Sequence, residues 1–301
     1  MSFEITNGIL KKYIPEPNET AVTIPDGVTM IDRKAFSRCN NLFSVKLPEG
    51  VTNIGMSAFQ DCKELIFVKL PQSLTRIGVG AFMGCDALGS IDIPQGVTYI
   101  RDRTFQNCKG LVYAVLPNEV TRIGDNAFRG CSHLKTVKMP DKIDSIGFYA
   151  FAQCKSLSSI VIPDGLTTIR NNAFSGCDGL NFIMIPESIQ KIGWETFPPR
   201  TILHFRIQNQ IFSIPFVSRT SEAFCHPELP ENTSQIVYYF IRNDNPESLK
   251  KFLSCGFVTS ENIDEFIRFA IDNQKYECQI VLMDYKNEYI GYQSIEDRLR
   301  L

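Results

Sequence analysis

Apolar and polar positions along this chain repeat with a period of 23 residues between residues 19 and 205. Residues 54–71 read IGMSAFQDCKELIFVKLP and residues 77–94 read IGVGAFMGCDALGSIDIP, with apolar residues at the same offsets. Such a period predicts a stack of similar units, because one unit of this size buries its apolar side only against its neighbours. Four residue types keep the period without an insertion: Pro25, Pro48, Pro71, Pro94, Pro117, Pro140, Pro163 and Pro186; Ile31, Ile54, Ile77, Ile100, Ile123, Ile146, Ile169 and Ile192; Phe36, Phe59, Phe82, Phe105, Phe128, Phe151, Phe174 and Phe197; and Cys39, Cys62, Cys85, Cys108, Cys131, Cys154 and Cys177.

The pattern inside one unit predicts its local structure. Residues 42–47 alternate between apolar and polar, which predicts a short strand with every second side chain pointing inward. Pro48 lacks an N–H and ends this strand at a corner, and residues 51–54 form a second short extended run. The A-F-x-x-C motif at residues 58–62 has the spacing of one helical turn that closes the coil. The sequence therefore predicts an α/β repeat solenoid in which equivalent residues stack in ladders.

The order of Pro, V-T-x-I-G and A-F-x-x-C in each unit resembles the BspA-like, or Treponema-type, leucine-rich repeats over residues 19–205. The resemblance implies a right-handed, curved solenoid of eight 23-residue units, with a parallel sheet along its concave side. Some members of this bacterial family resemble surface adhesins and carry export signals. The segment MSFEITNGILKKYIPEPNETAV lacks the basic start and apolar stretch of a signal peptide. We therefore expect a cytoplasmic protein from the sequence as given, or an extracellular surface protein if a signal has been removed.

Both ends of the repeat region carry signals of their own. Residues 1–18 are predicted to form an N-terminal cap hairpin, because Asn7-Gly8 is a strong two-residue turn signal. In the eighth unit, Pro198 and Pro199 replace the closing turn, so the cysteine ladder ends there. We expect Trp194, the single tryptophan, to cover the last open rung.

The pattern changes after the repeats. Residues 206–235 show no clear periodicity and are predicted to be an irregular connector. Residues 236–301 have helical periodicity and predict a small α-helical C-terminal domain, whose Cys255 and Cys278 are expected to face its interior. One predicted helix there places Ile263, Phe266, Ile267 and Ala270 on a single face.

Composition narrows the classes of function. Of the 301 residues, 44% are hydrophobic and 21% are charged, and the formal net charge is -2, as in an ordinary soluble globular protein. Without a basic excess, nucleic acid is disfavoured as a partner. No stretch approaches the roughly 18 apolar residues of a membrane span, so we expect no membrane partner. The motifs of dinucleotide, phosphate and zinc-protease sites are absent, so we predict no enzyme and no cofactor.

The seven equivalent cysteines are predicted to be buried free thiols that fill each coil as small apolar residues. Catalysis by one thiol needs a nearby base, and the chain holds only His133, His204 and His226. Structural zinc needs four converging ligands, whereas a straight ladder presents its thiols in parallel. Disulfides between neighbouring rungs are an alternative, because the expected Cα separation is within their range. We predict no metal site and no catalytic residue.

The outward strand positions are the candidate binding surface. A solvated face needs no large apolar side chains, and exposed aromatic residues flanked by lysines are typical of protein-binding patches. We therefore predict a non-catalytic module that binds a protein or peptide through the concave sheet. The residues that form this hypothetical site are Phe67, Lys69, Tyr113, Val115, Lys138, Val161, Phe182 and Met184.

Several alternatives to this binding surface stay open. β-Propensity alone could fill these positions with apolar residues, or the connector could fold over them. Single-stranded nucleic acid could stack on the exposed aromatic residues beside Lys46, Lys69 and Lys138, although Asp92 interrupts that row. The chain could also be a structural scaffold or an adhesin-like surface protein.

Overall fold

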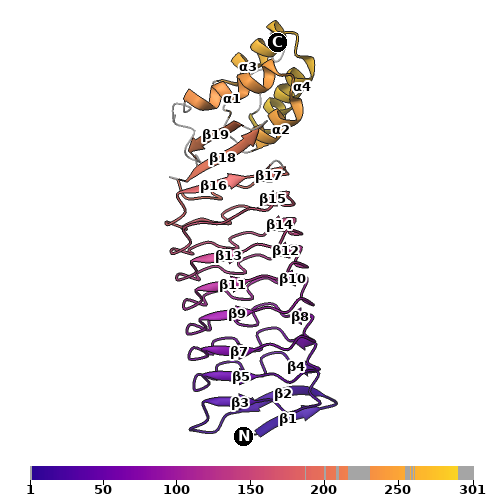
Figure 1. Ribbon diagram of the computed structural model, residues 1–301, viewed down its shortest axis with the longest axis vertical. Helices are drawn as coiled ribbons and strands as arrows, with labels where there is room; N and C mark the ends of the chain where they lie inside the picture. Colours follow the sequence, from indigo (N-terminus) through magenta and orange to yellow (C-terminus); the bar gives the residue numbers. More distant parts are fainter. Residues whose placement is uncertain are drawn as a thin grey trace.

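A computed structural model shows the chain as an elongated stack of coils with a group of helices at its C-terminal end (Figure 1). The structure describes residues 2–186, 188–199, 201–207, 210–215, 231–254, 258, 260 and 262–290. The chain makes about eight turns, and equivalent positions of successive turns are 23 residues apart. The predicted repeat solenoid with a C-terminal helical region is confirmed.

A hairpin closes the N-terminal end of the stack. Strand β1 (Ser2–Thr6) pairs antiparallel with β2 (Ile9–Ile14), as the sequence predicted. The turn between them places Asn7 at a φ of 51° and Gly8 at a φ of 73°, and a type I′ turn requires two such positive values. β2 then pairs in parallel with β4 (Met30–Ile31) of the first coil. The hairpin thereby covers the edge of one strand ladder.

One side of the solenoid is built from short strands of three or four residues. The central residue of each three-residue strand is buried, and the residues on either side of it point outward, as the alternating pattern predicted. They form parallel sheets in the orders β3-β5-β7 and β9-β11-β13, and residues 157–163 of the seventh coil form no strand. The strands are β3 (Ala21–Thr23), β5 (Ser44–Lys46), β7 (Phe67–Lys69), β9 (Ser90–Asp92), β11 (Tyr113–Val115), β13 (Thr136–Lys138) and β16 (Phe182–Ile185).

A second side carries strands of two residues, each ending in a buried isoleucine. These strands join the hairpin in one sheet, β1-β2-β4-β6-β8, and form a second sheet, β10-β12-β14-β15-β17. On both sides of the solenoid, one sheet therefore ends and the next begins at the same junction, between the third and fourth coils. Besides β4, these strands are β6 (Asn53–Ile54), β8 (Arg76–Ile77), β10 (Tyr99–Ile100), β12 (Arg122–Ile123), β14 (Ser145–Ile146), β15 (Thr168–Ile169) and β17 (Lys191–Ile192).

The third side of each coil is a run of tight turns, and the predicted helical turn is wrong. The N–H of Ala58 donates to the carbonyl of Gly55, and the N–H of Cys62 donates to that of Phe59, each at 3.3 Å and three residues back. Between them, the N–H of Phe59 donates at 2.7 Å to the carbonyl of Ala81 in the next coil. Amides that join coils are not free for helical bonding to the residue four positions earlier.

The core is a ladder of stacked aromatic rings. All the repeat phenylalanines are buried, and the centroids of neighbouring rings lie 4.9–5.6 Å apart. Tyr13 extends the ladder at the N-terminal end, 4.9 Å from Phe36. Phe197 is the last rung and is 2% exposed, whereas Trp194 is 62% exposed. The prediction that Trp194 covers this rung is wrong, because Trp194 occupies an outward corner position after Gly193.

The glycine of the V-T-x-I-G motif lets two coils approach closely. A Cβ at Gly78 would lie 2.6 Å from the carbonyl carbon of Gly55 and 2.6 Å from the amide nitrogen of Met56. Contacts of this length with backbone atoms force the coils apart. We therefore expect Gly78→Ala to lower the free energy of unfolding by about 1–3 kcal/mol, measured by urea unfolding.

Gly89 supplies the matched control for this prediction. A Cβ at Gly89 would meet no atom within 4 Å, so Gly89→Ala is expected to leave stability nearly unchanged. Asp32, Arg101 and Arg170 occupy the position of Gly78 in three other coils, which shows that a coil can adjust to a side chain there. The substitution should therefore weaken the fold without abolishing it. Equal losses in the two variants would contradict the close-approach explanation.

A three-stranded sheet carries the chain out of the solenoid. Strand β18 (Ile202–Ile207) pairs in parallel with β16 and antiparallel with β19 (Gln210–Pro215). The prediction of an irregular connector over residues 206–235 is therefore wrong for both ends of that range, since its last residues belong to a helix. The free edge of β16 needs a partner for its backbone groups, and β18 supplies it. Residues 216–230 lie outside the described residues.

The C-terminal region is helical, as predicted, and consists of α1 (Glu231–Arg242), α2 (Pro246–Ser254), α3 (Ile263–Asp272), α4 (Tyr276–Tyr285) and a π-helical turn η1 (Lys286–Ile290). The expected apolar face of α3 is buried, and so is Cys278, whereas Cys255 lies outside the described residues. Across the described parts of the chain, no helix combines the length and apolar character needed to cross a membrane.

Candidate interaction surface

The outward side chains of β3, β5, β7, β9, β11, β13 and β16, with residues 159 and 161 of the seventh coil, form one surface, here called the strand face. The buried central residue of each strand fixes which side chains reach it. All eight residues of the predicted site lie on the strand face and are exposed. The six apolar ones range in exposure from 38% at Met184 to 80% at Val161. The structure therefore places these side chains on one accessible surface.

Strand pairing decides which of these residues are neighbours. On β11, Tyr113 lies between Ser90 of β9 and Thr136 of β13. Val115, two residues further on, is paired with Lys138 of β13. Polar residues thus flank both apolar side chains, so the strand face presents separate apolar spots within a polar surround. Isolated anchors of this kind suit recognition by a partner with matching side chains.

The last predicted residues lie beside the C-terminal hairpin. β16 pairs with β18, so that Phe182 lies opposite Ile202 and Met184 lies opposite His204. The Phe182 ring also makes an edge contact with the His204 ring, with centroids 5.8 Å apart. β18 and β19 therefore extend the strand face beyond β16 along the long axis of the molecule (Figure 1), and Phe182 stays 56% exposed. Val161 comes from the coil without a strand and has no paired neighbour within this surface.

Two exposed residues next to the predicted site were not predicted. Phe43 and Ile66, each directly before a strand, are 45% and 55% exposed. The N–H of Ile66 donates to the carbonyl of Phe43, which places them side by side in adjacent coils. Together with Phe67 they form the most apolar part of the surface near the N-terminal end. In the sequence, each of them follows a buried leucine and precedes a strand. The alternation of residues within the strands therefore does not predict that they are exposed.

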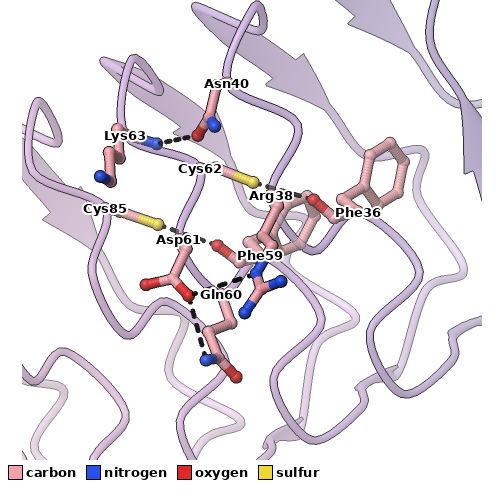
Figure 2. Close-up of polar contacts among 9 residues, drawn as sticks. All are labelled: Phe36, Arg38, Asn40, Phe59, Gln60, Asp61, Cys62, Lys63 and Cys85. Carbon is pink, nitrogen blue, oxygen red and sulfur yellow. Dashed lines mark hydrogen bonds and ion pairs between the residues drawn. The ribbon is translucent and has the colours of Figure 1, made fainter.

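The ladder thiols are bound to the backbone. Figure 2 shows the Cys62 thiol donating to the carbonyl oxygen of Phe36 and the Cys85 thiol donating to that of Phe59, at 2.9 Å and 3.1 Å. Each thiol is thus hydrogen-bonded to the backbone carbonyl of the repeat phenylalanine in the preceding coil. The same bond, at 3.0–3.2 Å, recurs for Cys108, Cys131, Cys154 and Cys177.

This environment gives the thiols a structural role. Burial raises the pKa of Cys85, Cys108, Cys131 and Cys154, so these thiols keep their protons and are poor nucleophiles. The described cysteines are buried free thiols, as expected of residues that pack the coil. Within the described ranges, no group of three His, Cys, Asp or Glu side chains is placed to hold a metal ion. The apolar strand face is therefore the best-supported functional surface.

Parallel strands on one side of every coil and a ladder of phenylalanines within define a leucine-rich-repeat solenoid. The family profile described as BspA type leucine-rich repeat region matches the chain in six copies, over residues 14–131 and 98–226. The chain therefore belongs to the BspA-type leucine-rich-repeat family. The family resemblance that the motifs indicated is confirmed.

Solved bacterial structures agree with this assignment. The leucine-rich-repeat protein of Treponema pallidum is 32% identical, with a TM-score of 0.55, over 60% of this chain and 87% of that one. A leucine-rich-repeat protein of Bacteroides ovatus is 30% identical, with a TM-score of 0.54, over 69% of this chain and 63% of that one. One from Eubacterium ventriosum is 27% identical, with a TM-score of 0.54, over 68% and 51%. No curated protein matches the chain.

Proposed function

We propose that this protein is a non-catalytic binding module that holds a protein or peptide partner on the strand face. Membership of a leucine-rich-repeat family supports a role in protein interaction. The observation that carries the proposal is the exposure of Phe67, Tyr113 and Phe182, each at least half exposed on the same side of the solenoid. When a partner covers large aromatic side chains that are exposed to water, their burial makes the free energy of binding more favourable.

The polar surround of these aromatics supports the same role. Lys69 and Lys138 occupy outward positions of the strand face and remain exposed. Apolar anchors surrounded by polar and charged groups form the usual architecture of a protein-binding surface, in which few residues supply most of the affinity. A surface adhesin that binds protein through the same residues would differ in location and partner, whereas a scaffold that only spaces the two ends of the chain would not need these exposed aromatic residues.

The test is a comparison of three immobilised proteins as baits for extracts of the source cells and of their surroundings. The first bait is the intact chain, and the second is Phe67→Ser/Tyr113→Ser/Phe182→Ser. The third is the control Met56→Ser/Tyr149→Ser/Trp194→Ser, which removes three exposed apolar side chains away from the strand face. Circular dichroism and thermal unfolding establish that all three baits fold alike.

We expect the intact and control baits to retain the same partner and the strand-face variant to lose it. That result assigns recognition to the strand face, because both variants remove a similar amount of exposed apolar surface. Loss of the partner from the control bait alone would place recognition on another side of the solenoid. Retention of one partner by all three baits would contradict the proposal.

A further inference from the structure

The two strand ladders of the solenoid break at one junction, here called the seam, between the coil of β7 and β8 and the coil of β9 and β10. β7 pairs only with β5 and β9 only with β11, while β8 pairs only with β6 and β10 only with β12. Figure 1 shows β7 and β9 more widely separated than β5 and β7. The Phe82 and Phe105 rings, at 5.6 Å, are the most widely spaced phenylalanine pair of the ladder.

Backbone hydrogen bonds on the third side hold the seam together, with one more at the start of the strand face, from the N–H of Gly89 to the carbonyl of Ile66 at 3.4 Å. On the third side, the N–H of Phe82 still donates to the carbonyl of Thr104 at 2.9 Å. On the far coil of the seam, Arg101 stands where the neighbouring coils have Gly78 and Gly124. The other coil with an arginine at this position, that of Arg170, is the coil that lacks a three-residue strand. Both coils with an arginine in place of this glycine thus adjoin a break in the strand face, whereas Asp32 at the same position in the first coil leaves both of its ladders paired.

A cavity of about 430 Å³ opens onto the strand face at the seam. Its volume is within the range of sites that hold a ligand, which is about 300–1,000 Å³. Both apolar and polar groups line it, so it offers both burial and hydrogen bonds. Its walls include Phe67, Lys69, Leu70, Ser90, Asp92 and Ile93.

Backbone groups of β7 face this opening. The N–H of Phe67 donates to the carbonyl of Phe43, and the carbonyl of Lys69 accepts from the N–H of Leu47, so both residues bond toward β5. The intervening residue, Val68, therefore turns its N–H and carbonyl toward β9, with which β7 forms no ladder. The seam is too narrow for a further strand between β7 and β9, since the Phe82 and Phe105 rings are 5.6 Å apart, so a ligand meets these groups only at the opening on the strand face.

Charge next to the seam selects the side chains of such a peptide. Lys46 and Lys69 lie side by side in register on β5 and β7, and neither forms an ion pair with any residue that the structure describes. Phe67 is exposed two residues before Lys69 on the same strand. Asp92, on the opposite wall, repels a carboxylate on its own side.

We propose that the seam binds an extended peptide segment in which an acidic residue and a large apolar residue stand two positions apart. The apolar side chain enters the cavity beside Phe67, and the carboxylate pairs with Lys46 and Lys69. The spacing follows from geometry, since residues two apart in an extended chain point the same way, as Phe67 and Lys69 do. This inference rests on the proposed function and names the chemistry of the partner.

The test begins with selection from a random nine-residue peptide library, displayed on phage, against the full chain. We expect the selected peptides to be enriched in Asp or Glu two positions from Phe, Leu or Ile. A synthetic peptide of the consensus is then titrated against variants by fluorescence anisotropy. Lys69→Glu is expected to weaken its binding at least about tenfold, because a reversed charge replaces an attraction by a repulsion. The control Lys155→Glu reverses the charge of an exposed lysine outside the strand face and is expected to change binding less than about twofold.

Other results overturn the inference and separate it from the proposed function. Selected peptides without acidic enrichment, or equal binding to Lys69→Glu and Lys155→Glu, would exclude the seam as the site. If such peptides still lose binding in Tyr113→Ser/Phe182→Ser, the strand face remains a recognition surface. If no peptide is selected and a glycan array binds the chain through Phe67, the ligand is a sugar and the peptide proposal fails.

Discussion

Raising the pH from 7 to 10 is expected to lower the free energy of unfolding by up to about 8 kcal/mol through four of the ladder thiols. Burial raises the pKa of Cys85, Cys108, Cys131 and Cys154 above that of an exposed thiol, which is about 8.5. The folded chain keeps these protons, whereas the unfolded chain loses them as the pH passes 8.5. Stability that is fully present below pH 8.5 is therefore lost above it, by about 2 kcal/mol for each thiol up to pH 10.

Urea unfolding between pH 7 and pH 10, under a reducing agent, measures this loss. The variant Cys85→Ala/Cys108→Ala/Cys131→Ala isolates the contribution of the thiols. It is less stable at pH 7, but the part of its pH dependence that these four thiols supply is expected to fall to about one quarter, because Cys154 alone remains of the four. An unchanged dependence in this variant would assign the alkaline loss to other groups.

Replacing Phe128 by alanine is expected to lower the free energy of unfolding by about 3–5 kcal/mol. The Phe128 ring is fully buried and stacks between the rings of Phe105 and Phe151, with centroids 5.2 Å away on both sides. Its removal leaves a cavity in the middle of the ladder, and the coils cannot close it because strands and turns fix their spacing. Because each coil contacts only its neighbours, the loss also weakens the coupling between the two halves of the array.

Phe43→Ala is the control, since it removes the same side chain from a position that is 45% exposed. Its effect on stability is expected to stay within about 0.5 kcal/mol. Hydrogen exchange adds a spatial readout. In Phe128→Ala the amides of the neighbouring coils, such as those of Phe105 and Phe151, should lose protection more than those of the N-terminal hairpin. Uniform loss along the solenoid would contradict a local defect.

Most of the solenoid could be predicted because one short pattern fixes it. A strand residue such as Val45 points inward by alternation, and the period alone stacks Phe36 on Phe59. The closing turn was mispredicted because the spacing of Ala58 and Cys62 is also that of a helix. Only the position of the next coil decides that the N–H of Phe59 bonds outward to Ala81. Local spacing does not contain this information.

The C-terminal strands were missed for a different reason. Residues 203–207 read LHFRI, which alternates as a strand does, but the signal is short and lies outside the period. The free edge of β16 favours β18 at that place, and an edge is a property of the assembled sheet. Trp194 was misplaced because size suggested burial, whereas its position in the unit is an outward corner.

The candidate site was also predictable only in part. Alternation correctly predicted that Phe67, Tyr113 and Phe182 are exposed, because the buried residue between each outward pair is unmistakable. The seam could not be predicted, although Arg101 is visible in the sequence as a departure from glycine. A side chain at that position does not part the ladder by itself, since the N–H of Arg170 still donates to the carbonyl of Ile146 at 2.9 Å. The break depends on how whole coils pack against one another.

Because the 23-residue period of the coils is uninterrupted, the length of the solenoid can change in steps of one coil. Because equivalent rings are 4.9–5.6 Å apart, duplication of one 23-residue segment lengthens the rod by about one rung and leaves each existing contact with an equivalent partner. Deletion of one segment shortens it in the same way. Unequal recombination within the gene thus moves the C-terminal helices toward or away from the hairpin in increments of one coil. Selection can tune the span between the two ends without redesigning the core.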